Sequence, residues 1–180
     1  MDTQVEIRLC GTKPLVFKKE DVERLRCQHR IVGALIGALP RLPLQNAYPG
    51  LPLLLSAEEA TLLISKDFAV MNASGNWTFL KTDLDRLRYR VFEYLWSKQL
   101  YITRGLKFGG DFMAYPGDPM RFHSHYIVLA TERDSPLALL DIISKGRLAI
   151  NVKKTFVIAG PAEESSDDDI ETFSIQWAGF

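Results

Sequence analysis

Hydrophobic and polar positions along the chain predict short strands separated by turns and helices. Residues 5–9 alternate at a period of two and predict a strand, and residues 15–17 predict its hairpin partner after a turn at 11–14. Further strands are expected wherever apolar residues cluster between turn-forming ones, at 68–71, 100–102, 105–115, 123–131, 155–159 and 172–177. Residues 33–52 contain several glycines and prolines, and we interpret them as a loop.

Four segments have the apolar spacing or the capping residues of helices. The first is short and covers residues 21–29. Ser56 with Glu59 three residues later forms a capping-box pattern that starts the second helix. Thr82, followed by acidic residues in the first turn, starts the clearest helix of the chain. Ser135 followed by proline predicts the start of the last helix, and Gly146 predicts its end.

The order of these elements predicts two units joined by a short connection. Residues 72–76 are small, polar and turn-forming, which is typical of a domain boundary. We therefore expect a small α+β domain at residues 1–71, a linker at 72–81 and an α/β domain at 82–180. The second unit should have a mixed sheet with flanking helices.

The composition is that of a globular protein. The chain is 47% hydrophobic and 24% charged, which excludes disordered, collagen-like and coiled-coil proteins. No apolar run reaches the roughly 18–20 residues of a membrane span, and the charged first 20 residues lack a signal-peptide pattern, so neither is expected. Cys10 and Cys27 match no disulfide framework or zinc pattern, and reduced thiols in the cytosol or nucleus are expected.

The charge is balanced overall but unevenly placed. The net charge is zero and the pI is about 6.8, which argues against a protein that binds nucleic acid by itself. Between Lys81 and Lys107, however, there are seven basic and three acidic residues, and between Glu163 and Glu171 there are six acidic and no basic ones. A neutral total can therefore hide a basic surface and an acidic loop in the second unit. Taken by itself, the acidic stretch is interpreted as a solvated loop.

Five residues of the second unit could carry chemistry: Tyr115, His123, His125, Lys153 and Lys154. On a strand, the two histidines would project from one face and could bind a metal ion, but no Cys, Asp or Glu follows at a ligand spacing. Alternatively, each is a surface histidine. A third reading is metal-free RNA cleavage, which needs a base for the 2′-hydroxyl, an acid for the leaving oxygen and a cation for the phosphorane. Phosphate-loop, dinucleotide and serine-hydrolase motifs do not occur.

The segment 106–126, LKFGGDFMAYPGDPMRFHSHY, is highly distinctive. It resembles the catalytic subunits of the tRNA-splicing endonuclease, most closely the eukaryotic type that cuts the 3′ splice site. The segments 94–96, 153–155 and 174–177 fit the same family. The resemblance is strong over residues 82–180 and weaker over 1–71, where 45–46 and 50–55 fit best.

The resemblance implies a restriction-endonuclease-like catalytic domain in which a tyrosine, a histidine and a lysine act together. The family pattern selects Tyr115 as general base, His123 rather than His125 as general acid, and Lys154 rather than Lys153 as the cation. The products would be a 2′,3′-cyclic phosphate and a 5′-hydroxyl, with no metal and no cofactor.

The resemblance also implies partners. Arg147 and Trp177 would stack on a flipped-out bulge nucleotide of the precursor tRNA. An acidic loop containing Asp167, Asp168 and Asp169 would dock on a partner subunit, and the last strand would pair with a structural subunit. The assembly would hold a second catalytic subunit and two structural subunits in the nucleus, away from any membrane.

Two alternatives and one departure from the family belong with this interpretation. The chain could be a non-catalytic structural subunit of the same assembly, although such subunits lack the Tyr–His–Lys set. It could instead be a metal-dependent nuclease using His123 and His125. Eukaryotic members carry a long charged insert between the two units, whereas only residues 72–76 separate them here.

Overall fold

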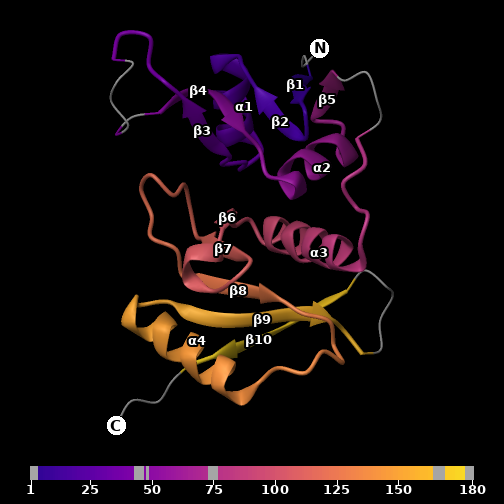
Figure 1. Cartoon of the computed structure of the whole chain (residues 1–180), viewed down its shortest axis with the longest axis vertical. Helices are drawn as coiled ribbons and strands as arrows, with labels where there is room; N and C mark the ends of the chain where they lie inside the picture. The colour runs from indigo at the N-terminus through magenta and orange to yellow at the C-terminus, as the bar shows by residue number, and fades with distance from the viewer. Residues whose placement is uncertain (1–3, 43–46, 48, 73–76, 164–168, 177–180) are drawn as a thin grey trace. The chain divides into compact units, whose positions relative to one another are not determined.

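The computed structural model describes residues 4–42, 47, 49–72, 77–163 and 169–176. The chain divides into two compact units, Met1–Phe79 and Leu80–Phe180, and each is described by itself. Figure 1 labels the elements of both. The predicted junction at 72–76 lies outside the described residues except for Asn72.

The first unit is a five-stranded mixed sheet with two helices. Along the chain it runs β1 (Val5–Cys10), β2 (Lys13–Val16), α1 (Lys19–Gln28), β3 (Ala34–Gly37), β4 (Gly50–Leu54), α2 (Ala57–Ser65) and β5 (Ala69–Asn72). The strand order is β3-β4-β2-β1-β5, in which only the β1–β5 pair is parallel. Its core is formed by fully buried aliphatic side chains, among them Val5, Ile7, Val16, Leu25, Leu62 and Leu63.

The predicted capping box at the start of α2 is present and also holds the chain that leads into β3. Ser56 Oγ accepts a hydrogen bond from the Glu59 N–H, and the Glu59 carboxylate accepts one from the Ser56 N–H. The same carboxylate accepts the N–H groups of Val32 (3.2 Å) and Gly33 (2.9 Å). Glu59 is buried, and burial raises the pKa of its carboxyl group.

The interpretation of residues 33–52 as loop is wrong, because the structure places β3 and the start of β4 there. The register between these strands shifts between Leu35 and Gly37, so residues 51 and 52 of β4 lie opposite residue 36 alone. Proline is tolerated in a sheet at such a bulge, where no ladder donor is needed. Leu53, next to Pro52, is buried and secures the pairing.

The second unit has another five-stranded mixed sheet, with two long helices. It runs α3 (Asp83–Ser97), β6 (Tyr101–Arg104), the 3₁₀ turn η1 (Leu106–Phe108), β7 (Phe112–Tyr115), β8 (Tyr126–Ala130), α4 (Leu139–Asn151), β9 (Thr155–Pro161) and β10 (Ile170–Ile175). The order is β10-β9-β8-β7-β6, and only β8–β9 is parallel. The predicted fold class, two mixed α/β units, is confirmed.

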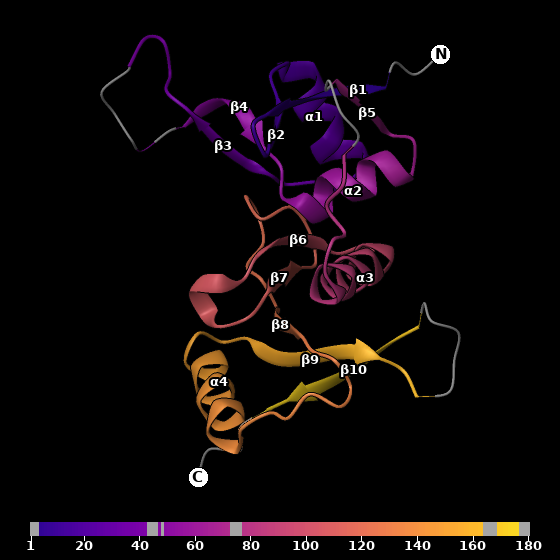
Figure 2. The same cartoon turned by 45° about the vertical axis from the view of Figure 1, so that its right-hand side comes forward.

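The helices α3 and α4 cover opposite faces of this sheet, as the turned view in Figure 2 shows. Phe92 of α3 makes an edge-to-face contact with Phe112 of β7, at 5.8 Å between ring centroids. Met113, the next strand residue, packs in a cluster with Ala149 of α4 and with Phe156 of β9. Since successive strand side chains point to opposite faces, β7 has one helix on each side.

Asp111 ties α3 to the sheet. Its Oδ1 accepts hydrogen bonds from the guanidinium of Arg88 on α3, at 2.8 Å from Nε and 2.7 Å from Nη2. Its Oδ2 accepts the N–H of Ala130 at the end of β8 (2.8 Å). The aspartate of the distinctive GGDF segment therefore has a structural role in this unit.

Several boundaries predicted for the second unit are wrong. Residues 105–115 are not one strand, because η1 ends at Gly109, which has a left-handed φ of 72°, and β7 starts only at Phe112. The strand predicted from residue 123 starts at Tyr126. The last helix starts after Ala138 and continues through Gly146, because packing of Ala149 in the core outweighs the helix-stopping tendency of glycine.

Candidate active site

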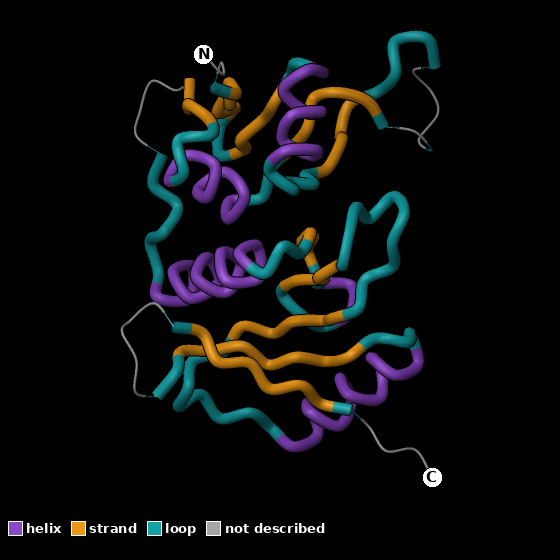
Figure 3. The backbone as a smooth tube through the Cα atoms, turned by 180° about the vertical axis from the view of Figure 1, so that it is seen from behind, coloured by secondary structure: helices purple, strands orange, loops and turns teal. Residues whose placement is uncertain are grey.

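Tyr115, His123 and Lys154 belong to segments that meet at one end of the second sheet. Figure 3 shows the course of the backbone through this sheet and its connections. Tyr115 is the last residue of β7, and His123 lies in the connection from β7 to β8. Lys154 lies between α4 and β9. β7 is antiparallel to β8, and β9 is parallel to β8. The last residue of β7 and the first residues of β8 and β9 therefore lie at the same end of the sheet.

Main-chain hydrogen bonds hold these three segments together. The His125 N–H donates to the carbonyl oxygen of Ala114, the residue before Tyr115, over 3.0 Å. The His125 carbonyl accepts the N–H of Thr155, the residue after Lys154, over 2.9 Å. Each of the three candidate residues is thus within two positions of a bonded main-chain group.

Lys154 is positioned by the end of α4 and by its own side chain. The Lys154 N–H donates to Ala149 O (2.8 Å) and the Lys153 N–H to Ile150 O (2.9 Å), the two bonds of a Schellman motif. Lys153 is in the left-handed conformation that this motif requires, with φ of 56°. The half-buried Lys154 Nζ donates to the carbonyl oxygen of Ser124 over 3.2 Å.

Tyr115 is half-buried on the α4 side of the sheet. Its ring packs against the cluster that contains Met113 and Ile127. The Thr103 hydroxyl on β6 donates a hydrogen bond to the Tyr115 hydroxyl oxygen over 3.3 Å. Ring packing and this bond restrict both torsions of the phenol.

His123 follows a tight turn and is exposed. Asp118 organises the turn, because its carboxylate accepts the Met120 N–H (2.8 Å) and its carbonyl accepts the Phe122 N–H (3.0 Å). A Cβ atom at Gly117 would lie 2.6 Å from the Phe122 ring, so this close approach needs glycine. The turn therefore determines where the backbone places His123.

The predicted strand placement of the two histidines is wrong, since the residues from 122 to 125 belong to no strand. The segment is nevertheless held between β7 and β9 by the His125 bonds. Ser124 is buried, whereas His123 and His125 are both exposed. The two imidazoles therefore still share the solvent-facing side of the segment.

An open depression of about 480 Å³ lies beside Lys154. The described residues that line it are His125, Tyr126, Ile150, Lys153, Lys154, Thr155 and Gln176. Among the described residues, the lining includes two lysines and a histidine but no carboxylate. Such a surface suits an anionic ligand.

The other predicted site residues are only partly described. Arg147 is exposed on α4 and lines a different depression, with Leu140 and Leu148 among its neighbours. Asp169 is exposed, and its carbonyl accepts the Ala162 N–H over 3.1 Å. The remaining three, Trp177, Asp167 and Asp168, lie outside the described residues.

Sequence reasoning missed Thr103, Ser124 and Gln176 as parts of the site. Thr103 lies near Tyr115 because β6 pairs with β7 in one particular register. Ser124 contributes its main-chain carbonyl, which any residue type would supply, so the sequence cannot indicate this contact. Gln176 reaches the depression because the end of β10 pairs beside the start of β9, with Ile175 opposite Phe156. The register of the β6–β7 pair is the one feature from which Thr103 could have been predicted to lie near Tyr115.

Among the described residues, no group of three or more His, Cys, Asp or Glu side chains could hold a metal ion. Within the same part of the chain, no helix has the length and apolar content needed to cross a membrane.

Two known families match the two units. Residues 5–74 match the family described as "TSEN34-like, N-terminal domain". Residues 86–172 match "tRNA intron endonuclease, catalytic C-terminal domain". Together the two matches cover both units described above.

Individual relatives point the same way. The chain is similar to the "tRNA-splicing endonuclease subunit Sen34" of Mus musculus, with 38% identity over 58% of this chain and 32% of the mouse protein. The Saccharomyces cerevisiae subunit of the same name shows 43% identity over 51% of this chain and 34% of its own length. The "Probable tRNA-splicing endonuclease subunit sen34" of Schizosaccharomyces pombe shows 28% identity over 99% of both chains.

The extent of these matches differs. In the mouse and budding yeast alignments the chain covers about a third of the relative's length. The fission yeast alignment has 281 positions, more than the 180 residues of this chain, and therefore spans insertions in that relative.

Proposed function

The chain belongs to the Sen34 family of tRNA-splicing endonuclease subunits, and we propose that it is the catalytic subunit that cuts precursor tRNA at the 3′ splice site. The observation that carries the proposal is the hydrogen-bonded meeting of the segments that bear Tyr115, His123 and Lys154 at one end of the sheet. A non-catalytic subunit would have no need to retain all three side chains there.

The proposed reaction is attack of the 2′-oxygen on the neighbouring phosphorus with loss of the 5′-oxygen. Tyr115 as the phenolate takes the proton from the 2′-hydroxyl and becomes the neutral phenol, and His123 as the imidazolium gives a proton to the departing 5′-oxygen. Lys154 stabilises the negative charge that gathers on the non-bridging oxygens of the phosphorane. The P–O2′ bond forms as the P–O5′ bond breaks, which leaves a 2′,3′-cyclic phosphate and a 5′-hydroxyl without a metal ion.

The positions of the three groups support these roles. His123 is exposed and can meet a large RNA substrate, whereas Tyr115 is oriented by packing and by the Thr103 hydroxyl. Lys154 uses one N–H of its ammonium group on Ser124 O, so two remain for phosphate oxygens. This arrangement holds the cation in place before the substrate binds.

The test is cleavage of an intron-containing precursor tRNA in EDTA by the reconstituted assembly. It would contain this chain unaltered, with His123→Ala or, as a matched control, with His125→Ala. We expect the unaltered assembly to cut both junctions and leave a 2′,3′-cyclic phosphate, His123→Ala to lose the 3′ cut alone, and His125→Ala to keep it. Retention of the 3′ cut by His123→Ala would identify a structural subunit, and loss of all cutting in EDTA would favour the metal-dependent alternative.

We further propose that Arg147 and Trp177 hold a flipped-out nucleotide of the precursor tRNA. Support comes from the exposed position of Arg147 on α4 and from the capacity of guanidinium and indole groups to stack on bases. Replacing Arg147 with Ala should weaken binding of a bulged substrate more than binding of one without the bulge.

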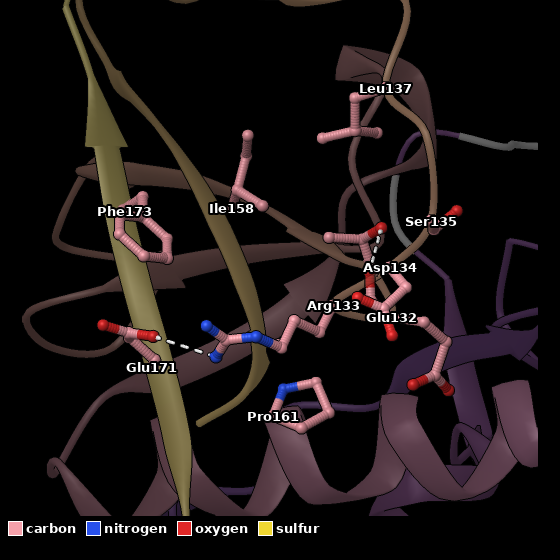
Figure 4. A pocket seen from close by; sticks show the side chains of 11 residues that line it. Glu132, Arg133, Asp134, Ser135, Leu137, Ile158, Pro161, Glu171 and Phe173 are labelled. Atoms are coloured by element: carbon pink, nitrogen blue, oxygen red, sulfur yellow. Dashed lines mark hydrogen bonds and ion pairs between the residues drawn. The ribbon is translucent and has the colours of Figure 1, made fainter. Parts of the chain in front are cut away.

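A structural subunit is proposed to pair with β10, the edge strand of the second sheet. Phe173 on this strand is 58% exposed, and it borders an open depression of about 400 Å³ together with Leu137 and Ile158 (Figure 4). Arg133 forms an ion pair with Glu171 of β10 and another, at 2.7 Å, with Glu163. An unpaired strand edge beside apolar side chains suits a partner strand.

The acidic loop is proposed to dock on a partner subunit in the nucleus. Support comes from the exposed Asp169 and from the eukaryotic origin of the Sen34 relatives. Changing Asp167, Asp168 and Asp169 to Asn should weaken assembly, as measured by native mass spectrometry. An unchanged assembly would leave this segment as a solvated loop.

A further inference from the structure

The depression beside Lys154 presents hydrogen-bond donors to solvent. The side chains of Lys153, Thr155 and Gln176 line it together with His125 and Lys154. The Lys154 ammonium group donates a hydrogen bond to Ser124 O, which holds it at the end of the sheet where Tyr115 and His123 lie. The depression therefore adjoins the proposed site through Lys154, the one proposed catalytic residue that the described part of its lining contains.

Lys153 contributes a side-chain cation to this depression, while only its main chain takes part in the hydrogen bonds that the described residues form. Its side chain is exposed and forms no hydrogen bond or ion pair with any other residue that the structure describes. No carboxylate of the residues that the structure describes lines the depression to neutralise this charge. Its ammonium group thus remains available to an anion.

The backbone of Lys153 makes lysine an unusual choice for this position. It is the left-handed residue of the Schellman motif that ends α4, with φ of 56°. Glycine fills this position most often and asparagine fills it sometimes, because other side chains are strained there. Arg30, Asp67 and Gln99 have the same left-handed conformation just after the other three helices, so this backbone alone does not mark a function. The argument for Lys153 rests on its exposed charge in the depression beside Lys154.

We propose that Lys153 binds a phosphodiester next to the one that is cleaved, and so contributes to the affinity for the RNA strand. This inference rests on the proposed function. In this arrangement the two consecutive lysines have different partners. Lys154 stabilises charge at the reacting phosphorus, whereas Lys153 holds the neighbouring phosphate equally in the bound and reacting states. Uniform binding of this kind affects substrate affinity and leaves the chemical step unchanged.

The test compares Lys153→Asn and Lys153→Gly, which suit the left-handed backbone, with Lys153→Arg, which keeps the cation. Each variant is reconstituted in the full assembly and assayed on precursor tRNA in single-turnover kinetics. We expect Asn and Gly to raise the half-saturating enzyme concentration about tenfold, with saturating rates within about twofold of the unaltered enzyme. The salt dependence of binding should weaken by roughly one phosphate contact, a slope change of about 0.7. Lys153→Arg should stay close to the unaltered enzyme.

The control is Lys98→Asn, an exposed lysine at the end of α3 that does not line the depression, and it should change neither quantity. Binding of a precursor tRNA with a 2′-deoxy nucleotide at the 3′ junction separates affinity from cleavage. Unchanged affinity and salt slope in Lys153→Asn would overturn the inference, as would a loss confined to the saturating rate. Failure of the proposed function has a different signature, since the assembly containing the unaltered chain would then not cut the 3′ junction.

Discussion

The Nζ atom of Lys154 donates a hydrogen bond to the main-chain carbonyl oxygen of Ser124 over 3.2 Å. This contact joins the segment that follows α4 to the segment that bears His123, 30 residues earlier in the chain. A main-chain acceptor cannot be removed by mutation of Ser124, so the position of the ammonium group depends only on the lysine and the local backbone. The cation and the proposed general acid are therefore positioned by the same short stretch of chain.

Replacing Lys154 with Met should abolish most of the activity and leave the fold intact. Methionine keeps the length of the side chain but removes the charge, and loss of one charge-stabilising group typically lowers a rate by about 10²–10³. The measurement is the saturating single-turnover rate of 3′ cleavage, with circular dichroism to check folding. A fall in affinity at an unchanged saturating rate would contradict the assigned role, because it would describe a binding residue.

Two arginines only two residues apart on α3 should differ sharply in their contribution to stability. Arg88 binds the carboxylate of Asp111, whose side chain is 10% exposed, whereas Arg86 pairs with the 91% exposed Asp83. Arg88→Ala leaves a largely buried carboxylate without its cation and should cost about 2–3 kcal/mol. Arg86→Ala removes a surface pair and should cost less than about 1 kcal/mol. Urea unfolding measures both, and equal costs would show that Asp111 is not the anchor of α3.

The first unit should lose part of its stability in acid because of Glu6. The hydrogen bond from Asn72 on β5, followed by those from Arg8 and Lys18, lowers the pKa of this carboxyl from 4.5 to about 2. The unfolded chain then binds the proton more readily than the folded one. The contribution of Glu6 is therefore complete above pH 4.5 and is lost as the pH falls toward 2.

The check is thermal unfolding of the unaltered chain and of Glu6→Gln between pH 2 and 7. The difference in Tm between the two should be largest above pH 5 and should shrink steadily on acidification. A difference that stays constant over this range would mean that the carboxylate is not stabilised by its neighbours in the folded state.

Local signals in the sequence predicted the starts of two helices because the chemistry of a cap is local. Ser56 with Glu59, and Thr82 with Asp85, each form the reciprocal bonds of a capping box in the structure. These bonds involve residues three apart, so residue type and spacing are sufficient to identify them. Local signals were not always sufficient, because the start predicted at Ser135 and the stop predicted at Gly146 were both wrong for the last helix.

The histidines show why the geometry of the site was only partly predictable. The apolar residues after His125 predicted a strand that includes both histidines, yet β8 begins only at Tyr126. Before that point, His125 makes one main-chain hydrogen bond to Ala114 and accepts one from Thr155, and residues 122–124 are not part of a strand. Likewise, nothing in the residue types around Lys153 indicates a left-handed backbone. Tertiary hydrogen bonds determine both features, and these depend on which strands become neighbours.

Gly146, predicted to end the last helix, instead lies buried within α4 and provides a test of stability. Glycine in a helix interior is less favourable than alanine by about 1 kcal/mol. A Cβ at this position would meet only the Ile175 methyl group at 3.7 Å, an ordinary contact, so Gly146→Ala should stabilise the unit by about 0.5–1 kcal/mol. The matched control is Gly160→Ala in β9, where the Cβ would lie 2.5 Å from the Thr131 carbonyl oxygen and should destabilise the unit. Chemical denaturation distinguishes the two signs, and a loss of stability in Gly146→Ala would mean that the helix packs more tightly there than the structure indicates.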